Sequence, residues 1–192
     1  MVTIQTSSDW ESKRTVQKGN VGERIVRQHL ESLGLICYLP ATDGAHGFDI
    51  LAQKNKLNTI ACEVKTKEML DKWPVTGFNQ SVFEGYRTLW EMHRIPVRFY
   101  FVDAELHEIY GNDLKELEKP YVAENGYTYP FVMRKNGRAV RLYHYDTMKV
   151  IKELTDDEVA EIRMLTNKSY SNSYSKKMYE ERKANQQLKI FI

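Results

Sequence analysis

"FDILAQKNKLNTIACEVKT", residues 48–66, decides the fold that we expect for this chain. Two β-prone runs flank a polar connection, which is the pattern of a β-hairpin. With a five-residue loop, Gln53 pairs with Thr59, and Asp49 then faces Glu63 across the hairpin. Directly opposed residues have Cβ atoms about 4.5–5.5 Å apart, so these two carboxylates repel each other unless a cation lies between them.

Side chains alternate along a strand, so Phe48 and Ile50 are expected on one face of the hairpin and Asp49 on the other. On the partner strand, Glu63 and Lys65 share the face of Asp49. The face could be an exposed polar surface or a site. The apolar residues around it are typical of an interior strand, and they favour a site.

The surrounding sequence predicts an α/β sandwich in which helices flank a mixed sheet. Three consecutive strands indicate an antiparallel meander, and the strand–helix–strand run over 59–103 indicates a parallel crossover. The expected elements are a helix over 17–33, strands over 35–40, 48–53 and 58–66, a helix over 77–94 and a strand over 95–103.

Beyond residue 104 we expect a short hairpin, a short helix from Asp113, and two strands that turn at Asn136-Gly137, a strong hairpin dipeptide. Thr155 followed by Glu158 predicts the capped start of another helix. The expected organisation is an N-terminal segment (1–15), a core (16–118), a hairpin-plus-helix extension of the same domain (119–165) and a flexible or partner-binding tail (166–192).

Composition narrows the class of protein. The 192 residues carry a net charge of +2, and no apolar run approaches the roughly 18 residues of a membrane span. The start lacks the basic and apolar regions of a signal peptide. Cys37 and Cys62 lie in apolar strand-like stretches, which predicts reduced core residues in a cytoplasmic protein. The sequence has no CxxC or Cys/His cluster for zinc.

The spacing resembles a known family. Asp49, then Glu63-Val64-Lys65 fourteen residues later, after a helix that carries Glu23, looks like the PD-(D/E)xK nuclease superfamily. The stretch "KGNVGERIV" resembles the first helix of archaeal Holliday-junction resolvases. The resemblance covers residues 16–103 and implies a restriction-endonuclease-like fold. One departure is Phe48, which stands where the family often has proline.

The resemblance implies a metal-dependent endonuclease that hydrolyses DNA in repair, recombination or restriction. Asp49, Glu63 and the backbone carbonyl of Val64 would bind Mg²⁺ or Mn²⁺, Glu23 would reach the metal through water, and Lys65 would activate the attacking water. Each residue has a plainer interpretation: Glu23 as a glutamate favoured by the helix dipole, and Lys65 as a structural ion pair. The alternative function is a catalytically inactive DNA-binding or protein-interaction domain on the same fold.

Four further residues are candidates for substrate binding. Lys18 and Arg24 belong to a basic cluster around the first helix, which could steer a polyanion. His46 could touch a phosphate or could be an incidental loop histidine. Gln80 could approach the site or could be a capping or surface amide. A tyrosine set could stack on bases or pack on the core: Tyr127, Tyr129, Tyr143 and Tyr145.

The tail carries a second resemblance. Gln187 to Phe191, "QLKIF", resembles the short peptide by which bacterial proteins dock on the DNA polymerase sliding clamp, with Gln187, Leu188, Ile190 and Phe191 as the binding residues. The alternative is a terminal element packed on its own domain. A homodimer is the further expected partner, because nucleases of this kind cut two strands.

Overall fold

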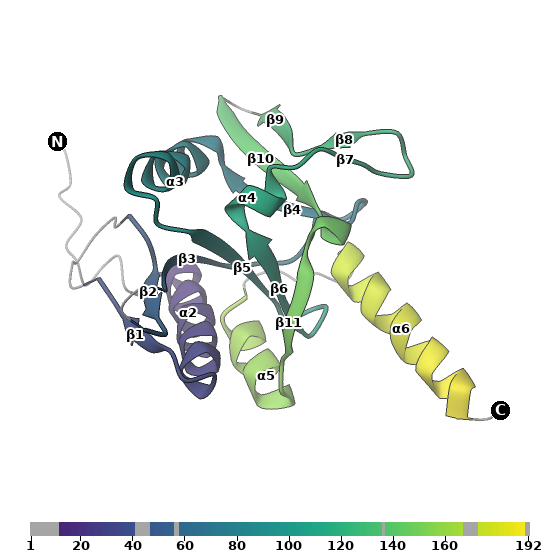
Figure 1. Ribbon diagram of the computed structural model, residues 1–192. Helices are drawn as coiled ribbons and strands as arrows, with labels where there is room; N and C mark the ends of the chain where they lie inside the picture. Colours follow the sequence, from purple (N-terminus) through teal and green to yellow (C-terminus); the bar gives the residue numbers. More distant parts are fainter. Residues whose placement is uncertain (1–11, 41–46, 56–57, 136, 167–172, 191–192) are drawn as a thin grey trace, which may run out of the picture.

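The structure, a computed structural model, describes residues 12–40, 47–55, 58–135, 137–166 and 173–190. A six-stranded mixed sheet forms the central layer, in the order β1-β2-β3-β5-β6-β11 (Figure 1). Its strands are β1 (Ile36–Tyr38), β2 (Ile50–Gln53), β3 (Thr59–Thr66), β5 (Val97–Asp103), β6 (Glu108–Asp113) and β11 (Lys149–Glu153). The helices are α2 (Arg14–Ser32), α3 (Gln80–His93), α4 (Leu114–Leu117), α5 (Asp156–Met164) and α6 (Tyr174–Ile190), with a 3-10 turn η1 (Tyr145–Thr147). The predicted α/β sandwich is confirmed.

The predicted hairpin register is also confirmed. Gln53 pairs with Thr59 in the β2–β3 ladder, β1 to β3 run antiparallel, and β3 pairs with β5 in parallel. The expected face of Phe48 is wrong. Phe48 precedes β2 and packs in the same cluster as Leu51, away from Ile50, because the strand alternation does not reach back to it.

Both faces of the sheet are buried. On one face, α2 and α5 cover a cluster that includes Ile25, Cys62 and Ile162. The opposite face holds an aromatic cluster around Phe99, where the stacked ring of Phe78 lies 4.4 Å away, centroid to centroid. Strand β3 therefore has neighbours on both faces and on both edges, which fixes its position in the molecule.

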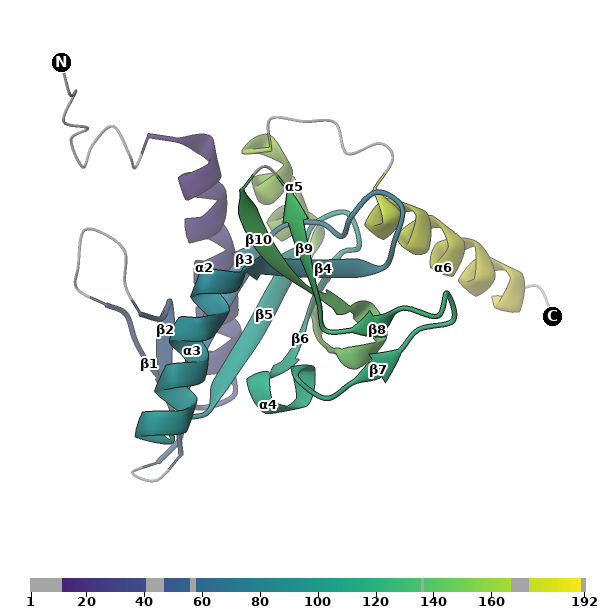
Figure 2. The ribbon, with the colours of Figure 1, turned by 90° about the horizontal axis from the view of Figure 1, so that it is seen from above.

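A second sheet covers part of the aromatic face; its β9–β10 pair is the hairpin expected from the sequence, and its third strand, β4, was not expected. Its order is β4-β10-β9, and a two-stranded ribbon lies next to it (Figure 2). The strands are β4 (Val75–Asn79), β9 (Phe131–Lys135) and β10 (Arg138–His144), with β7 (Tyr121–Val122) and β8 (Thr128–Tyr129) in the ribbon. Residues 77–79 were predicted to be helical, but they pair with β10. Gly77 permits the pairing, because a Cβ there would lie 1.9 Å from the Arg141 carbonyl oxygen.

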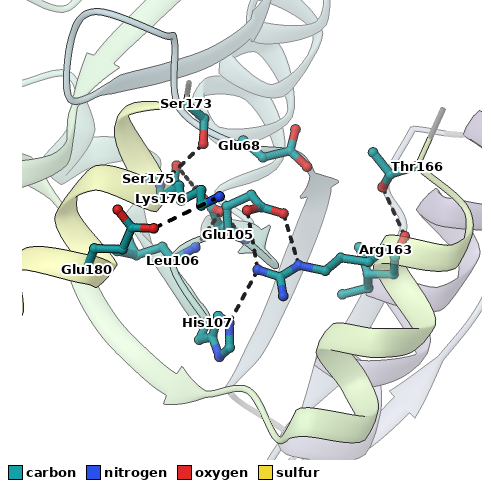
Figure 3. A network of polar contacts seen from close by, with 12 residues as sticks. Glu68, Glu105, Leu106, His107, Arg163, Thr166, Ser173, Ser175, Lys176 and Glu180 are labelled. Atoms are coloured by element: carbon teal, nitrogen blue, oxygen red, sulfur yellow. Dashed lines mark hydrogen bonds and ion pairs between the residues drawn. The ribbon is translucent and has the colours of Figure 1, made fainter. Parts of the chain in front are cut away.

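The C-terminal helix α6 is docked on the core through its first half, where the sequence predicted a flexible or partner-binding tail over 166–192. Ser175 near its start is buried, accepts a hydrogen bond from the Met69 N–H at 2.9 Å, and donates one to Asp103 at 2.5 Å. Figure 3 shows this junction beside Arg163 of α5, which binds Glu105. The local sequence carries no sign of this docking. The buried partners of Ser175 lie about 70 to 100 residues away in the chain, and a local pattern does not reveal such partners.

Three further predictions meet the structure here. The capping box of Thr155 and Glu158 is present at the start of α5. Tyr129, Tyr143 and Tyr145 are buried, so they pack rather than present their rings, whereas Tyr127 is 52% exposed. Cys37 and Cys62 are free thiols in β1 and β3.

Among the described residues, no helix is long and apolar enough to cross a membrane.

Candidate active site

Asp49 lies immediately before β2 and is fixed by two backbone contacts. Its N–H donates to the Cys62 carbonyl at 3.0 Å, and its Oδ2 accepts a hydrogen bond from the Val64 N–H at 2.6 Å. The side chain is buried, with the residue 8% exposed. Continuing the ladder by one residue puts Asp49 opposite Glu63, as the sequence predicted.

Glu63 is buried near the middle of β3, and both of its carboxylate oxygens have partners. The Lys65 ammonium forms an ion pair with Oε1, and the Tyr86 hydroxyl donates a hydrogen bond to Oε2. Tyr86 comes from α3, where its ring packs edge-on against Phe99 with centroids 5.4 Å apart. The sequence predicted only that Tyr86 belongs to a helix over 77–94. Its spacing carried no signal that the hydroxyl would reach a carboxylate on β3.

The electrostatics of the site reflect two acids crowded beside one base. Burial raises the pKa of Asp49, against the Lys65 charge and the Val64 N–H, and the charge of Glu23 raises it further. Burial also raises the pKa of Glu63, with repulsion from Asp49 adding to the effect. For Lys65, burial acts to lower the pKa, but the Glu63 and Asp49 carboxylates outweigh it and leave the pKa raised. The lysine is therefore an ammonium, and two buried acids share this one cation.

Helix α2 brings Glu23 to the same region. A Cβ on Gly22 would lie 1.8 Å from the Thr66 Oγ1, so only glycine allows α2 to approach β3 this closely. Glu23 follows directly in the helix, and its charge acts on both Asp49 and Lys65. The fold thus brings Glu23 within electrostatic reach of Asp49 and Lys65, which are themselves coupled to Glu63.

The oxygen ligands at this site are of the type that a hard divalent cation prefers, but they are few. Among the described residues, no three His, Cys, Asp or Glu side chains are grouped as a metal cluster. Two adjacent buried carboxylates, Asp49 and Glu63, are instead the main candidates to hold a metal, and the backbone of Val64 follows Glu63 and binds Asp49 through its N–H. Mg²⁺ commonly takes one or two protein carboxylates and keeps several waters, so such a small set is sufficient.

The basic candidates on α2 have structural partners. Lys18 is buried and forms an ion pair with Glu68 at 2.7 Å. Arg24 forms an ion pair with Glu161, which ties α2 to α5. Each cation would have to give up its ion pair to bind a phosphate, which weakens the prediction that they bind substrate.

The remaining candidates are less well placed. Gln80 is the first residue of α3 and donates to Glu84 at 3.1 Å, while its buried Oε1 has no hydrogen-bond partner in the structure. His46 lies outside the described residues, as does Phe191 of the tail. The backbone of Gln187, Leu188 and Ile190 belongs to α6.

A scan of protein-family models found no match to the chain, and a search of the curated proteins found none either. Among solved structures, the chain is similar to a Holliday junction resolvase from Archaeoglobus fulgidus, an archaeal hyperthermophile. The two share 15% sequence identity with a TM-score of 0.47, over 68% of this chain and 86% of that chain.

Proposed function

We propose that the protein is a metal-dependent endonuclease that hydrolyses phosphodiester bonds in DNA. The observation that supports it is the placement of Asp49 and Glu63, both buried, beside the Lys65 ammonium. Burying two adjacent carboxylates costs free energy unless cations compensate for them, and the ion-pair partner of Glu63 is one lysine. Such a costly arrangement is typical of a functional site.

In this proposal Asp49, Glu63 and the Val64 carbonyl hold Mg²⁺ or Mn²⁺, and Glu23 reaches the metal through water. The bound metal polarises the phosphoryl group and lowers the pKa of water. The chain's own residues position these groups. The Val64 N–H orients Asp49, and Tyr86 fixes the rotamer of Glu63.

In this proposal Lys65 orients the attacking water and stabilises the negative charge that develops on the phosphoryl oxygens. Its ammonium stands beside Glu63 and stays protonated, because both carboxylates raise its pKa. A protonated lysine can donate a hydrogen bond to the water and offset the negative charge that gathers on the phosphoryl oxygens. It is not a general base in this state.

The second candidate function is a DNA-binding or protein-interaction domain without catalysis. One observation favours it: both carboxylate oxygens of Glu63 are engaged within the protein, by Lys65 and Tyr86. Metal binding separates the two functions. A nuclease of the proposed kind binds Mn²⁺ in calorimetric titrations and loses that binding in Asp49→Asn, whereas the inactive domain has no such dependence on Asp49.

Partners and location remain part of the proposal. A homodimer would place two sites on two strands, and the "QLKIF" peptide would dock on a sliding clamp. A cytoplasmic location suits both roles.

Light scattering tests whether the protein forms a dimer. Binding of purified sliding clamp to the full chain and to a Leu188→Ala variant tests the peptide.

The deciding experiment is cleavage of labelled branched, duplex and single-stranded DNA with Mg²⁺ or Mn²⁺. Wild type is compared with Lys65→Ala and with Lys149→Ala, a control on β11, an edge strand three positions from β3 in the sheet. Cutting that needs metal and is lost only in Lys65→Ala supports the nuclease. Absence of cutting by the wild type on every substrate contradicts it, and DNA binding without cutting supports the inactive domain.

A further inference from the structure

Lys67 continues the line of charged side chains on β3. Its N–H donates to the Val102 carbonyl at 3.0 Å, so the parallel pairing of β3 with β5 extends past Thr66. Alternation then puts Lys67 on the same side as Glu63 and Lys65. The side chain is partly exposed. It extends the proposed active site by one position toward the end of the strand.

The ammonium of Lys67 donates a hydrogen bond to the Gly77 carbonyl of β4. Within the described parts of the chain, no carboxylate forms an ion pair with it. The adjacent acid, Glu68, points to the other side of the strand and pairs with Lys18, and both of those side chains are at most 10% exposed. Lys18 thus has the Glu68 carboxylate as its counter-ion, whereas Lys67 has only the neutral Gly77 carbonyl as a hydrogen-bond acceptor.

This position is costly for a cation. Burial and the nearby Lys65 charge together lower the pKa of Lys67 to about 8, while the charge of Glu68 acts in the opposite direction. A charged group that lacks a counter-ion is stabilised by any anion that can reach it. Two ammonium groups on one side of a strand, with one of them unpaired, form a place where a phosphate would be bound.

We propose that Lys67 binds a phosphate of the DNA backbone next to the phosphate that Lys65 serves. This inference rests on the proposed nuclease function and adds a residue to it. Residues two apart on a strand are separated by about 6.6 Å, which is comparable to the spacing of successive phosphates along one strand. Long, flexible lysine stems can adjust that span, so the two side chains can engage neighbouring phosphates of one strand.

The first test is the salt dependence of DNA binding, measured by fluorescence anisotropy in EDTA so that no cleavage occurs. Each phosphate contact contributes about 0.9 to the slope of log K against log salt for duplex DNA. Lys67→Met should reduce the slope by about that amount, whereas Lys67→Arg should retain it. Lys149→Met, at the far edge of the sheet, is the control and should leave the slope unchanged.

The second test uses pH, and it needs no neutral variant. The groups that act on Lys67 are the charges of Lys65 and, from the other side of the strand, Glu68, together with the Gly77 carbonyl of β4, which accepts its hydrogen bond. Above pH 8 the free protein loses the Lys67 proton and must regain it to bind a phosphate. Wild-type affinity should therefore fall between pH 7 and pH 9, and the affinity of Lys67→Arg should fall less.

The outcomes separate the two proposals. A wild type that binds and cuts DNA, with an unchanged salt slope in Lys67→Met, overturns the role of Lys67 and leaves the nuclease intact. A wild type that neither binds nor cuts overturns both. If Lys67→Met fails to fold, as judged by its thermal melt, the comparison of wild type with Lys67→Arg across pH decides: equal profiles overturn the proposal.

Discussion

At the scale of single residues, the contact between Tyr86 and Glu63 was predicted neither by the sequence motif nor by the residue spacing. Its hydroxyl holds one oxygen of Glu63 while Lys65 holds the other, so the carboxylate has little rotational freedom. Groups that orient a metal ligand typically change metal affinity or activity by about 10–100-fold when they are removed. Removing the Tyr86 hydroxyl therefore tests whether the orientation of the Glu63 carboxylate matters for metal binding and cleavage.

We predict that Tyr86→Phe lowers metal-dependent cleavage by about 10–100-fold. The control is Tyr143→Phe, which removes a similar hydroxyl-to-carboxylate contact, 3.1 Å from Glu118, elsewhere in the aromatic cluster. Both variants should melt at slightly lower temperatures, and only Tyr86→Phe should lose activity. Equal activity in the two variants would show that the Tyr86 contact is purely structural.

Asp103 gives the chain a pH-dependent stability. Its carboxylate is fully buried, and burial raises its pKa to about 7 from an ordinary value of 3.8. The folded protein therefore holds a proton that the unfolded chain releases, so the contribution of Asp103 to stability is fully present below about pH 4 and is lost as pH rises through 7. Chemical denaturation of wild type and Asp103→Asn between pH 4 and 8 should give a smaller pH dependence in the variant. An identical dependence in both would contradict this origin.

Part of the candidate site could be predicted from the sequence, and the rest could not, for physical reasons. Asp49, Glu63 and Lys65 could be predicted because strand alternation and one hairpin register place them together. Tyr86 could not be predicted, because its contact with Glu63 depends on how α3 packs on the sheet. The pairing of Lys18 with Glu68 joins residues 50 positions apart, and local charge patterns do not reveal such a partner.

At the scale of elements, the contact of α2 with β3 sets the position of Glu23. The helix was predicted over 17–33, and Gly34, which has a φ of 81°, follows its end in the structure. Strand β4 was not readable, because it exists by pairing with β10 about 60 residues later. Elements defined by local periodicity were predicted, and those defined by distant partners were not.

We predict opposite effects for two glycine substitutions in α2. Gly22→Ala forces its Cβ against Thr66 and should lower the free energy of unfolding by about 1–3 kcal/mol. Gly19→Ala meets no atom within 4 Å and should raise it by up to about 1 kcal/mol, because alanine favours the helix. Urea denaturation measures both. A loss of stability in both variants would mean that the tight helix–strand contact is not the cause.

At the scale of the whole molecule, the two clusters share one sheet, and α6 packs on the aromatic one through Tyr174, Met178 and Tyr179. We predict one cooperative unfolding transition by calorimetry. Ser175→Ala removes the acceptor of the Met69 N–H and a donor to Asp103, so the whole transition should move down by about 2–4 °C for each kcal/mol lost. Ser81→Ala, an exposed control on α3, should not move it. A separate early transition in Ser175→Ala would show that α6 unfolds independently.

The buried thiol of Cys62 has a use beyond packing. It lies in β3 one residue before Glu63, and burial raises its pKa to about 12. Alkylating reagents attack the thiolate, so Cys62 reacts only when the strand opens to solvent, whereas the partly exposed Cys37 needs no such opening of β3. The chain thus contains its own chemical probe: the rate at which Cys62 is labelled, read by mass spectrometry, measures how often the strand that carries Glu63 and Lys65 separates from its neighbours.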